Sequence, residues 1–400
     1  MPPETLLLRI LGLESRAARL EGAFAADPEL GLMWRSGAAL TEACRSVALE
    51  DIHVFEGDVI HRHLENRLTD AEGARGADAV TALLRVIASP GDLAGDTAAV
   101  LDRCWRAAVS IDDGAFPFDG AAVADRIRRP LEAAPTPFLG ALRAAIVFRM
   151  ETDSTAPSAD RLVFIAAEHA LRGAGRTQEG RGPGPASLLR RVEAGWILTP
   201  SVALTQGGFR AWSPGTLAGL ESLLGGLTAE ADRALGQLAV LRRWRMDAQA
   251  VAAARSGKSR LRDLVRLVAR EPLLTAPYLR ETLGVSRRAS FTLVDEAEAA
   301  GILRCITPRT SWRVWARPDM ADRLALRSPR RRVDRGERQT APGVANDPQR
   351  AIAERAGVRS PALREDDEAR EAAALAALDD AMTHADAVLA KYASRQDRGS

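Results

Sequence analysis

Apolar residues recur at spacings of three and four along most of the chain, a period typical of helices with one buried face. Phe138 to Met150 is apolar on nearly every side, so we expect a central buried helix there. These patterns predict a mainly α fold with a helical N-terminal domain over residues 1–172. The other amphipathic stretches of that domain are residues 4–22, a helix that begins at Asp27-Pro28, and residues 76–89, 95–110, 120–133 and 158–171.

The chain beyond this domain alternates between breaks and further helices. Residues 173–187 are rich in Gly and Pro, which predicts a flexible loop or a domain boundary. Residues 188–256 read as a helical continuation, and the helix that runs to Leu241 is expected to end in the basic run 242–245. That run could contact DNA or be an exposed helix end.

The stretch from residue 257 to 316 carries an ordered series of helix starts and stops. Ser259 can cap a helix that Pro272 ends, because proline has no N–H to donate. Thr275 can cap a second helix that stops at Gly284, since glycine best takes the left-handed conformation at a helix C-terminus. Two helices are expected here, and Gly284-Val285-Ser286 is expected to form a tight turn between the second of them and a third helix.

A third helix is predicted from Arg287 to Ala300, capped by Ser286 and stopped by Gly301. One face would pack on the two preceding helices through Ser290, Leu293, Val294 and Ala297. The other face suits the major groove of DNA, where arginine pairs with guanine and a phenyl ring meets a thymine methyl. The base-reading candidates beside the cap are Arg287, Arg288, Phe291 and Thr292.

The period changes after Gly301. Residues 302–306 and 311–315 are short β-rich runs joined by Thr307-Pro308-Arg309-Thr310, which predicts a β-hairpin. The whole of 257–316 therefore reads as a winged helix-turn-helix, with a helical packing module as the alternative interpretation. The hairpin arginines placed for backbone phosphates are Arg304, Arg309 and Arg313.

Charge supports this assignment. The chain has 55 basic and 53 acidic residues, a net charge of +2. From Lys258 to Arg335 there are 18 Lys and Arg against 9 Asp and Glu, a local charge of +9 that leaves −7 for the rest. The positive field is therefore concentrated around the predicted DNA reader.

The C-terminal part is expected to hold a basic disordered linker over residues 317–365 and an amphipathic helix over 366–394. The linker includes Arg330, Arg331 and Arg332, which would add phosphate attraction of no sequence preference. The helix repeats apolar residues at alternating gaps of three and four, as in a short coiled coil. A homodimer through Leu375, Leu378, Met382 and Leu389 and docking of this helix on the chain's own body are equally supported.

The sequence offers no catalytic motif, and we expect no cofactor and no metal. His61 and His63 lie about 200° apart on a helix, so a shared ion is disfavoured. The GKS at residues 257–259 lacks the earlier glycine and the strand of a phosphate loop. With three scattered cysteines, no secretion signal and no membrane-length apolar run, a cytoplasmic protein is expected.

Three stretches carry a resemblance to a family of uncharacterised bacterial proteins, which join a domain of unknown function to a helix-turn-helix. They are TEACRSVALEDIHVFEGDVIH, PTPFLGALRAAIVFRM and SGKSRLRDLVRLVAREPLLTAPYLRETLGVSRRASFTLVDEAEAAGILR. The layout also resembles Fic-type adenylyltransferases, with residues 46–50 echoing their inhibitory helix. Their catalytic HPFxxGNGR is absent, since residues 116–120 lack its histidine and arginine.

The resulting hypothesis is a DNA-binding transcription regulator whose main partner is double-stranded DNA. Two alternatives stay open. One is a catalytically degenerate Fic-like adenylyltransferase scaffold, and the other is a protein-interaction adaptor of a plasmid or toxin module.

Overall fold

A single residue, Asp27, separates the first two helices of the computed structural model. Helix α1 (Pro3–Ala26) ends before it, and α2 (Pro28–Ala48) begins after it with proline at the first helical position. The Asp27 carboxylate accepts a hydrogen bond from the Leu30 amide at 3.2 Å, so the predicted cap is confirmed. The structure describes residues 3–65, 71–108, 119–153, 156–173, 192, 194–206, 208, 210–256, 259–307 and 313–324.

The helical body consists of α1–α9, and its centre is the pair α7 and α8. Helix α7 (Pro137–Glu151) is capped by Thr136, whose hydroxyl accepts from the Leu139 amide at 3.3 Å. It buries Phe138, Leu142 and Phe148 on different sides, as the sequence predicts. The other helices of the body are α3 (Glu56–Glu65), α4 (Ala71–Ala88), α5 (Thr97–Ala108), α6 (Gly120–Glu132), α8 (Pro157–Gly173) and α9 (Pro200–Thr205).

Residues 194–199, inside the stretch expected to continue as helix, form no helix or strand. Two buried carboxylates hold this segment and the start of α9 in place. Glu168 accepts from the Leu198 amide at 2.9 Å, and Glu42 accepts from the Ser201 amide at 2.8 Å. Each carboxylate supplies an acceptor to a backbone N–H that would otherwise be buried without one.

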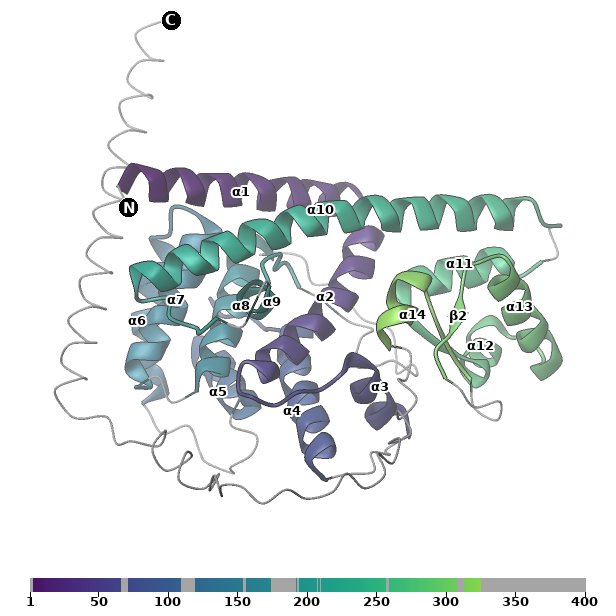
Figure 1. Ribbon diagram of the computed structural model, residues 1–400, viewed down its shortest axis with the longest axis horizontal. Coiled ribbons are helices and arrows are strands. Elements are labelled where there is room, and N and C mark those ends of the chain that lie inside the picture. The colour runs from purple at the N-terminus through teal and green to yellow at the C-terminus, as the bar shows by residue number, and fades with distance from the viewer. Residues whose placement is uncertain are drawn as a thin grey trace, which may run out of the picture. The chain divides into compact units, whose positions relative to one another are not determined.

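Helix α10 (Leu217–Ala253) spans 37 residues, about 55 Å at the helical rise. It lies beside α1 (Figure 1), and three arginine contacts along α1 and the adjoining Asp27 align α10 parallel to α1. Arg9 donates to the Glu221 carbonyl at 3.1 Å, Arg16 pairs with Asp232 at 2.8 Å, and Arg245 pairs with Asp27 at 2.8 Å. The basic run 242–245 therefore lies inside this helix, and its prediction as a helix end is wrong.

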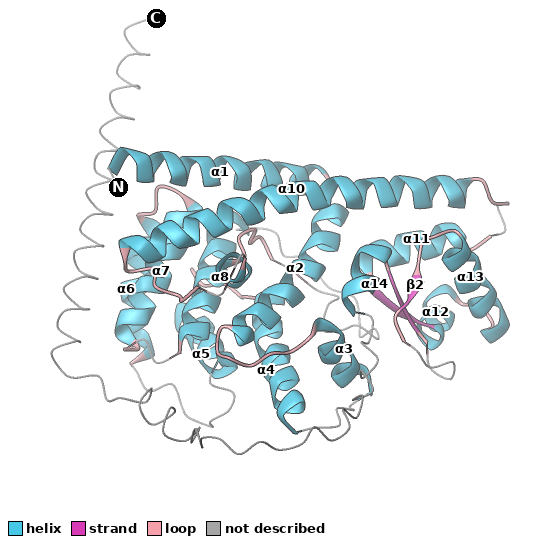
Figure 2. Ribbon diagram, viewed as in Figure 1, coloured by secondary structure: helices cyan, strands magenta, loops and turns pink. Residues whose placement is uncertain are grey.

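The C-terminal segment (residues 259–307 and 313–324) contains four helices and a small antiparallel sheet of strand order β1-β3-β2 (Figure 2). In the register of that sheet, Trp315 lies opposite both Leu274 and Cys305. The sequence predicted two strands here, and it did not predict β1, which lies between α11 and α12. The elements are α11 (Leu261–Arg270), β1 (Leu273–Thr275), α12 (Ala276–Leu283), α13 (Arg287–Ala299), β2 (Arg304–Cys305), β3 (Val314–Ala316) and α14 (Pro318–Leu324).

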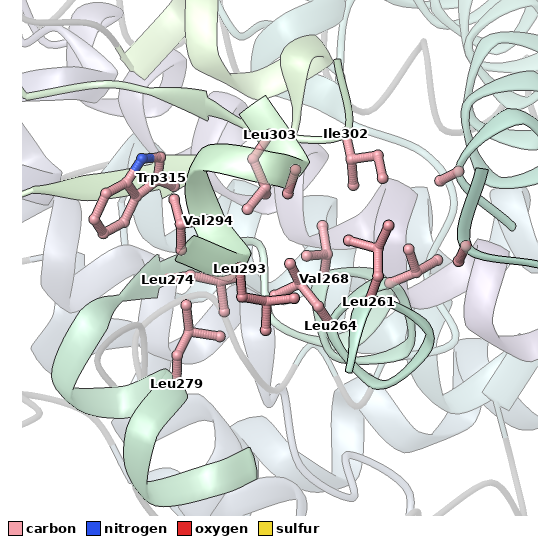
Figure 3. Close-up of a cluster of buried hydrophobic side chains, with 14 residues drawn as sticks. Leu261, Leu264, Val268, Leu274, Leu279, Leu293, Val294, Ile302, Leu303 and Trp315 are labelled. Carbon is pink, nitrogen blue, oxygen red and sulfur yellow. The ribbon is translucent and has the colours of Figure 1, made fainter. Parts of the chain in front are cut away.

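One hydrophobic cluster holds α11, β1, α12, α13 and β3 together (Figure 3). Leu264 of α11, Val294 of α13 and Trp315 of β3 are each fully buried in it. Full burial of side chains of this size contributes roughly 1.5–3 kcal/mol each. Ala248 and Ala252 of α10 belong to the same cluster, so α10 packs on this segment as well as on α1.

Residues 317–324 are part of this packed structure, and the expectation of a disordered linker is wrong for them. Arg317 is 1% exposed; it donates to the Met33 carbonyl at 3.1 Å and pairs with Asp319 at 3.0 Å. Arg323 of α14 pairs with Glu56 at 2.6 Å. The buried residues of α14 are Met320, Ala321 and Leu324.

None of the helices in the described residues combines the length and the apolar content needed to cross a bilayer.

By its internal contacts the chain divides into two units. One comprises Met1–Pro214 and Ala218–Leu326, and the other comprises Gly215–Leu217 and Arg327–Ser400. Nearly all of the described residues belong to the first unit.

Candidate nucleic-acid interface

The start of α13 is fixed by the turn that precedes it. Gly284 ends α12 in the left-handed conformation at φ 62°, which a side chain disfavours. Its amide and that of Val285 both donate to the Arg280 carbonyl. Ser286 then caps α13, its hydroxyl oxygen accepting from the Ala289 amide at 3.2 Å. The Thr275, Gly284 and Ser286 predictions are thus confirmed as local structure.

The faces of α13 divide as its sequence predicts. Ser290, Leu293, Val294 and Ala297 are buried, whereas Arg287, Arg288 and Thr292 are exposed. Phe291 is half-buried and its ring packs against the hydrophobic cluster. Only part of the Phe291 ring is therefore available to a ligand.

The arginines of this region divide into two groups by their partners. Several are held by carboxylates: Arg245 by Asp27, Arg255 by Glu296, Arg260 by Asp263, Arg270 by Glu29, Arg304 by Asp322, Arg317 by Asp319 and Arg323 by Glu56. Within the described residues, no carboxylate pairs with Arg280, Arg287, Arg288 or Arg313. The four lie on α12, at the start of α13 and directly before β3.

This division separates two predicted phosphate ligands, Arg304 and Arg313. Arg304 is exposed but engaged by Asp322 of α14, so it would have to exchange one anion for another. Arg313 is half-buried with no carboxylate partner in the described part of the chain. Arg280 is exposed on α12 and was not among the predicted ligands, because the second helix carries no other basic residue to mark it.

The second half of α13 carries acidic side chains. Glu298 accepts from the Cys305 amide at 3.0 Å, and Glu296 pairs with Arg255 at 2.7 Å, so both have structural partners. Asp295 is exposed on the same side as Arg288 and Thr292. Its negative charge would repel an anion, so the first two turns of the helix are the part that suits an anionic ligand.

A groove of about 580 Å³ lies between the start of α13 and the junction of α10 with α11. We call it the α10–α13 groove. Arg288 and Thr292 line it from α13, whereas Arg287 and Phe291 do not. The full lining is Ser256, Ser259, Arg260, Val285, Ser286, Arg288, Ala289, Thr292, Leu293 and Glu296.

Burial changes the titration of histidine and cysteine side chains in the body. His61 is buried, and burial lowers the pKa of the His63 imidazole. Burial also raises the pKa of the Cys44 thiol well above its usual range and that of Cys104 to about 12, which makes both poor nucleophiles. Among the residues that the structure describes, no group of three His, Cys, Asp or Glu side chains could hold a metal ion.

Several predicted positions lie outside the described residues, and their roles stay predictions. They are Arg309, Arg330, Arg331, Arg332, Leu375, Leu378, Met382 and Leu389, together with residues 174–187 of the expected loop.

No protein-family model matches the chain. No curated protein matches it either.

Proposed function

We propose that residues 257–316 form a winged helix-turn-helix and that the protein binds double-stranded DNA as a transcription regulator. The order of elements supports this proposal: α11, α12 and α13 are followed by the antiparallel strands β2 and β3. The left-handed glycine between α12 and α13 gives the short turn that such a motif requires.

The observation that carries the proposal is the state of Arg287 and Arg288. Both guanidiniums are exposed at the capped start of a helix, and neither meets a carboxylate among the described residues. An unpaired arginine keeps all five N–H donors available for a guanine edge or a phosphate. The arginines that face the helical body are instead engaged, as Arg245, Arg270 and Arg323 illustrate.

In this proposal the base readers are found among Arg287, Arg288, Phe291 and Thr292, which enter the major groove. Backbone contacts come from Arg280 and Arg313, and from the predicted phosphate ligands Arg304, Arg309 and the run 330–332. A protein that makes several such contacts binds DNA with a steep dependence on salt.

The test is selection of preferred duplexes by the full chain from a random library, followed by binding titrations of the winners. Arg287→Ala should weaken binding to the preferred duplex by about 5- to 150-fold, the value of one bidentate base contact, and relax the preference at one position. Arg106→Ala is a charge-matched control, because Arg106 is an exposed arginine of α5 in an i,i+4 pair with Asp102.

The expected result is a lower affinity for the preferred duplex with Arg287→Ala and an unchanged affinity with Arg106→Ala. Equal affinity and an unchanged preferred sequence in both variants would remove the base-reading assignment. Failure of the unmodified chain to retain any duplex at low salt would overturn DNA binding altogether, and would favour a protein partner for this surface.

A further inference from the structure

We propose that the α10–α13 groove binds the phosphodiester backbone of one DNA strand, and that Arg288 is a phosphate ligand while Arg287 reads bases. This inference rests on the proposed function and divides its base-reading candidates into two roles. It follows from which side chains line the groove and from the hydrogen bonds those side chains already make.

Helix α13 presents two edges at its exposed start. Arg288, Thr292 and Glu296 follow one another at four-residue spacing, and all three line the groove. Arg287 and Phe291 lie at the same spacing on the neighbouring edge, outside the groove lining. If the second edge meets the base edges, the groove receives the strand that flanks them, because phosphates border the major groove on both sides.

The hydroxyls of the groove suit a phosphate oxygen. The Ser259 oxygen accepts from the Leu261 amide at 3.2 Å, and the Ser286 oxygen accepts from the Ala289 amide at 3.2 Å. Each serine acts there as an acceptor, so its own O–H remains available as a donor. The two donors belong to residues from opposite sides of the groove, one before α11 and one before α13.

The charge of the groove suits a singly charged phosphodiester. Arg260 and Arg288 bring two positive charges to its lining, and Arg255 neutralises Glu296 beside them. Asp263 pairs with Arg260 at 2.9 Å, so one net positive charge remains, on Arg288. Arg260 is still 57% exposed and keeps donors free for a second contact to the same strand.

The experiment measures the affinity of the full chain for its preferred duplex at salt concentrations from 50 to 200 mM. Each phosphate contact contributes about 0.9 to the slope of log affinity against log salt. Affinity falls as salt rises from 50 to 200 mM, and the factor of this fall should be about 3.5 times smaller for Arg288→Ala than for the unmodified chain, because one phosphate contact is lost. Arg260→Ala should behave likewise, and neither variant should change the preferred sequence.

Two further measurements make the assignment specific. Arg288→Lys should retain the salt slope, because an ammonium still neutralises a phosphate. Replacing single phosphates beside the contacted bases with neutral methylphosphonates should weaken binding by the unmodified chain at one position. At that same position Arg288→Ala should show no further loss, since it lacks the partner of that phosphate.

An altered sequence preference in Arg288→Ala with an unchanged slope would overturn the inference and make Arg288 a base reader. Unchanged slopes in both Arg288→Ala and Arg260→Ala would show that no phosphate binds in the groove, while DNA binding itself would stand. Loss of all DNA binding by the unmodified chain is the separate result that removes the proposed function and this inference together.

Discussion

Asp160 of α8 is a carboxyl group whose ionisation should set how the stability of the helical body depends on pH. Its side chain is fully buried, with Trp212 donating to Oδ2 at 3.2 Å and Arg149 at 3.6 Å from the same oxygen. Oδ1 has no hydrogen-bond partner in the described part of the chain. Burial raises the pKa of Asp160 from 3.8 to about 7, against the opposing effects of Arg149 and Arg161.

The sign of the effect follows from the raised pKa. Because the folded state binds this proton more tightly than the unfolded state, the stabilisation is fully present below the unfolded pKa of 3.8. It is lost as the pH rises towards about 7. The full difference corresponds to about 4 kcal/mol at roughly 1.4 kcal/mol per pH unit, and about 2.5 kcal/mol of it falls between about pH 5 and 8.

Asp160→Asn imitates the protonated carboxyl and removes this titration. We expect the free energy of unfolding of the variant, relative to the unmodified chain, to rise by about 2.5 kcal/mol between about pH 5 and 8. The measurement is denaturant unfolding followed by circular dichroism at several pH values. Asp125→Asn is the matched control, because Asp125 is an exposed carboxylate of α6 paired with Arg128.

A difference between Asp160→Asn and the unmodified chain that stays constant over this pH range would refute the reasoning. It would mean that Asp160 is ionised throughout, and that Arg149 and Arg161 outweigh its burial. The Asp125→Asn control should show no change with pH over the same range, because the Asp125 side chain is exposed and folding does not remove it from water.

Three further substitutions test local features of the C-terminal segment by chemical unfolding. Ser286→Ala should destabilise the fold by about 1 kcal/mol through loss of the α13 cap, and Ser286→Asp should not. Gly284→Ala should cost about 1–2 kcal/mol through its positive φ alone, since a Cβ there would meet nothing within 4 Å. Arg317→Met should cost about 2 kcal/mol by leaving Asp319 and the Met33 carbonyl without their donor, and adding Asp319→Asn should recover part of the loss.

Local signals in the sequence were enough to predict α12 and α13 with their caps, whereas α11 has Arg260 and not the predicted Ser259 as its N-cap. Thr275, Gly284 and Ser286 act within a few residues of their own positions, as caps and as a left-handed stop. Such interactions depend on neighbours in the chain and can therefore be predicted without knowledge of the fold. The same holds for the buried face of α13, which follows from helical periodicity.

Elements that depend on distant partners were missed. Strand β1 has three residues, and its pairing with β3 joins Leu274 to Trp315. A three-residue run has too little alternation to stand out as a strand. Helix α14 did carry a signal in Pro318 followed by the apolar residues Met320, Ala321 and Leu324, but the surrounding basic composition favoured a linker.

The roles of individual arginines are the part of the site that sequence could not supply. Arg304 and Arg313 look alike in the predicted hairpin, yet Asp322 of α14 engages only Arg304. Arg288 and Arg287 are neighbours in sequence, yet only Arg288 lines the α10–α13 groove. Tertiary packing decides which arginine has a carboxylate partner and which one lines the groove. The charge distribution along the sequence therefore located the basic region but could not distinguish the roles of its arginines.

The hydrophobic core of the C-terminal segment extends across the domain boundary expected at residue 257, because helix α10 contributes to it. Ala248 and Ala252 lie before that boundary, yet they are buried in the same cluster as Leu264 and Val294. Arg255 extends the connection by its ion pair with Glu296 of α13. Because α10 also runs beside α1, a shift of this helix against the body would move side chains that share a hydrophobic cluster with α13. The orientation of the proposed reading helix is therefore tied to the helical body through one continuous helix.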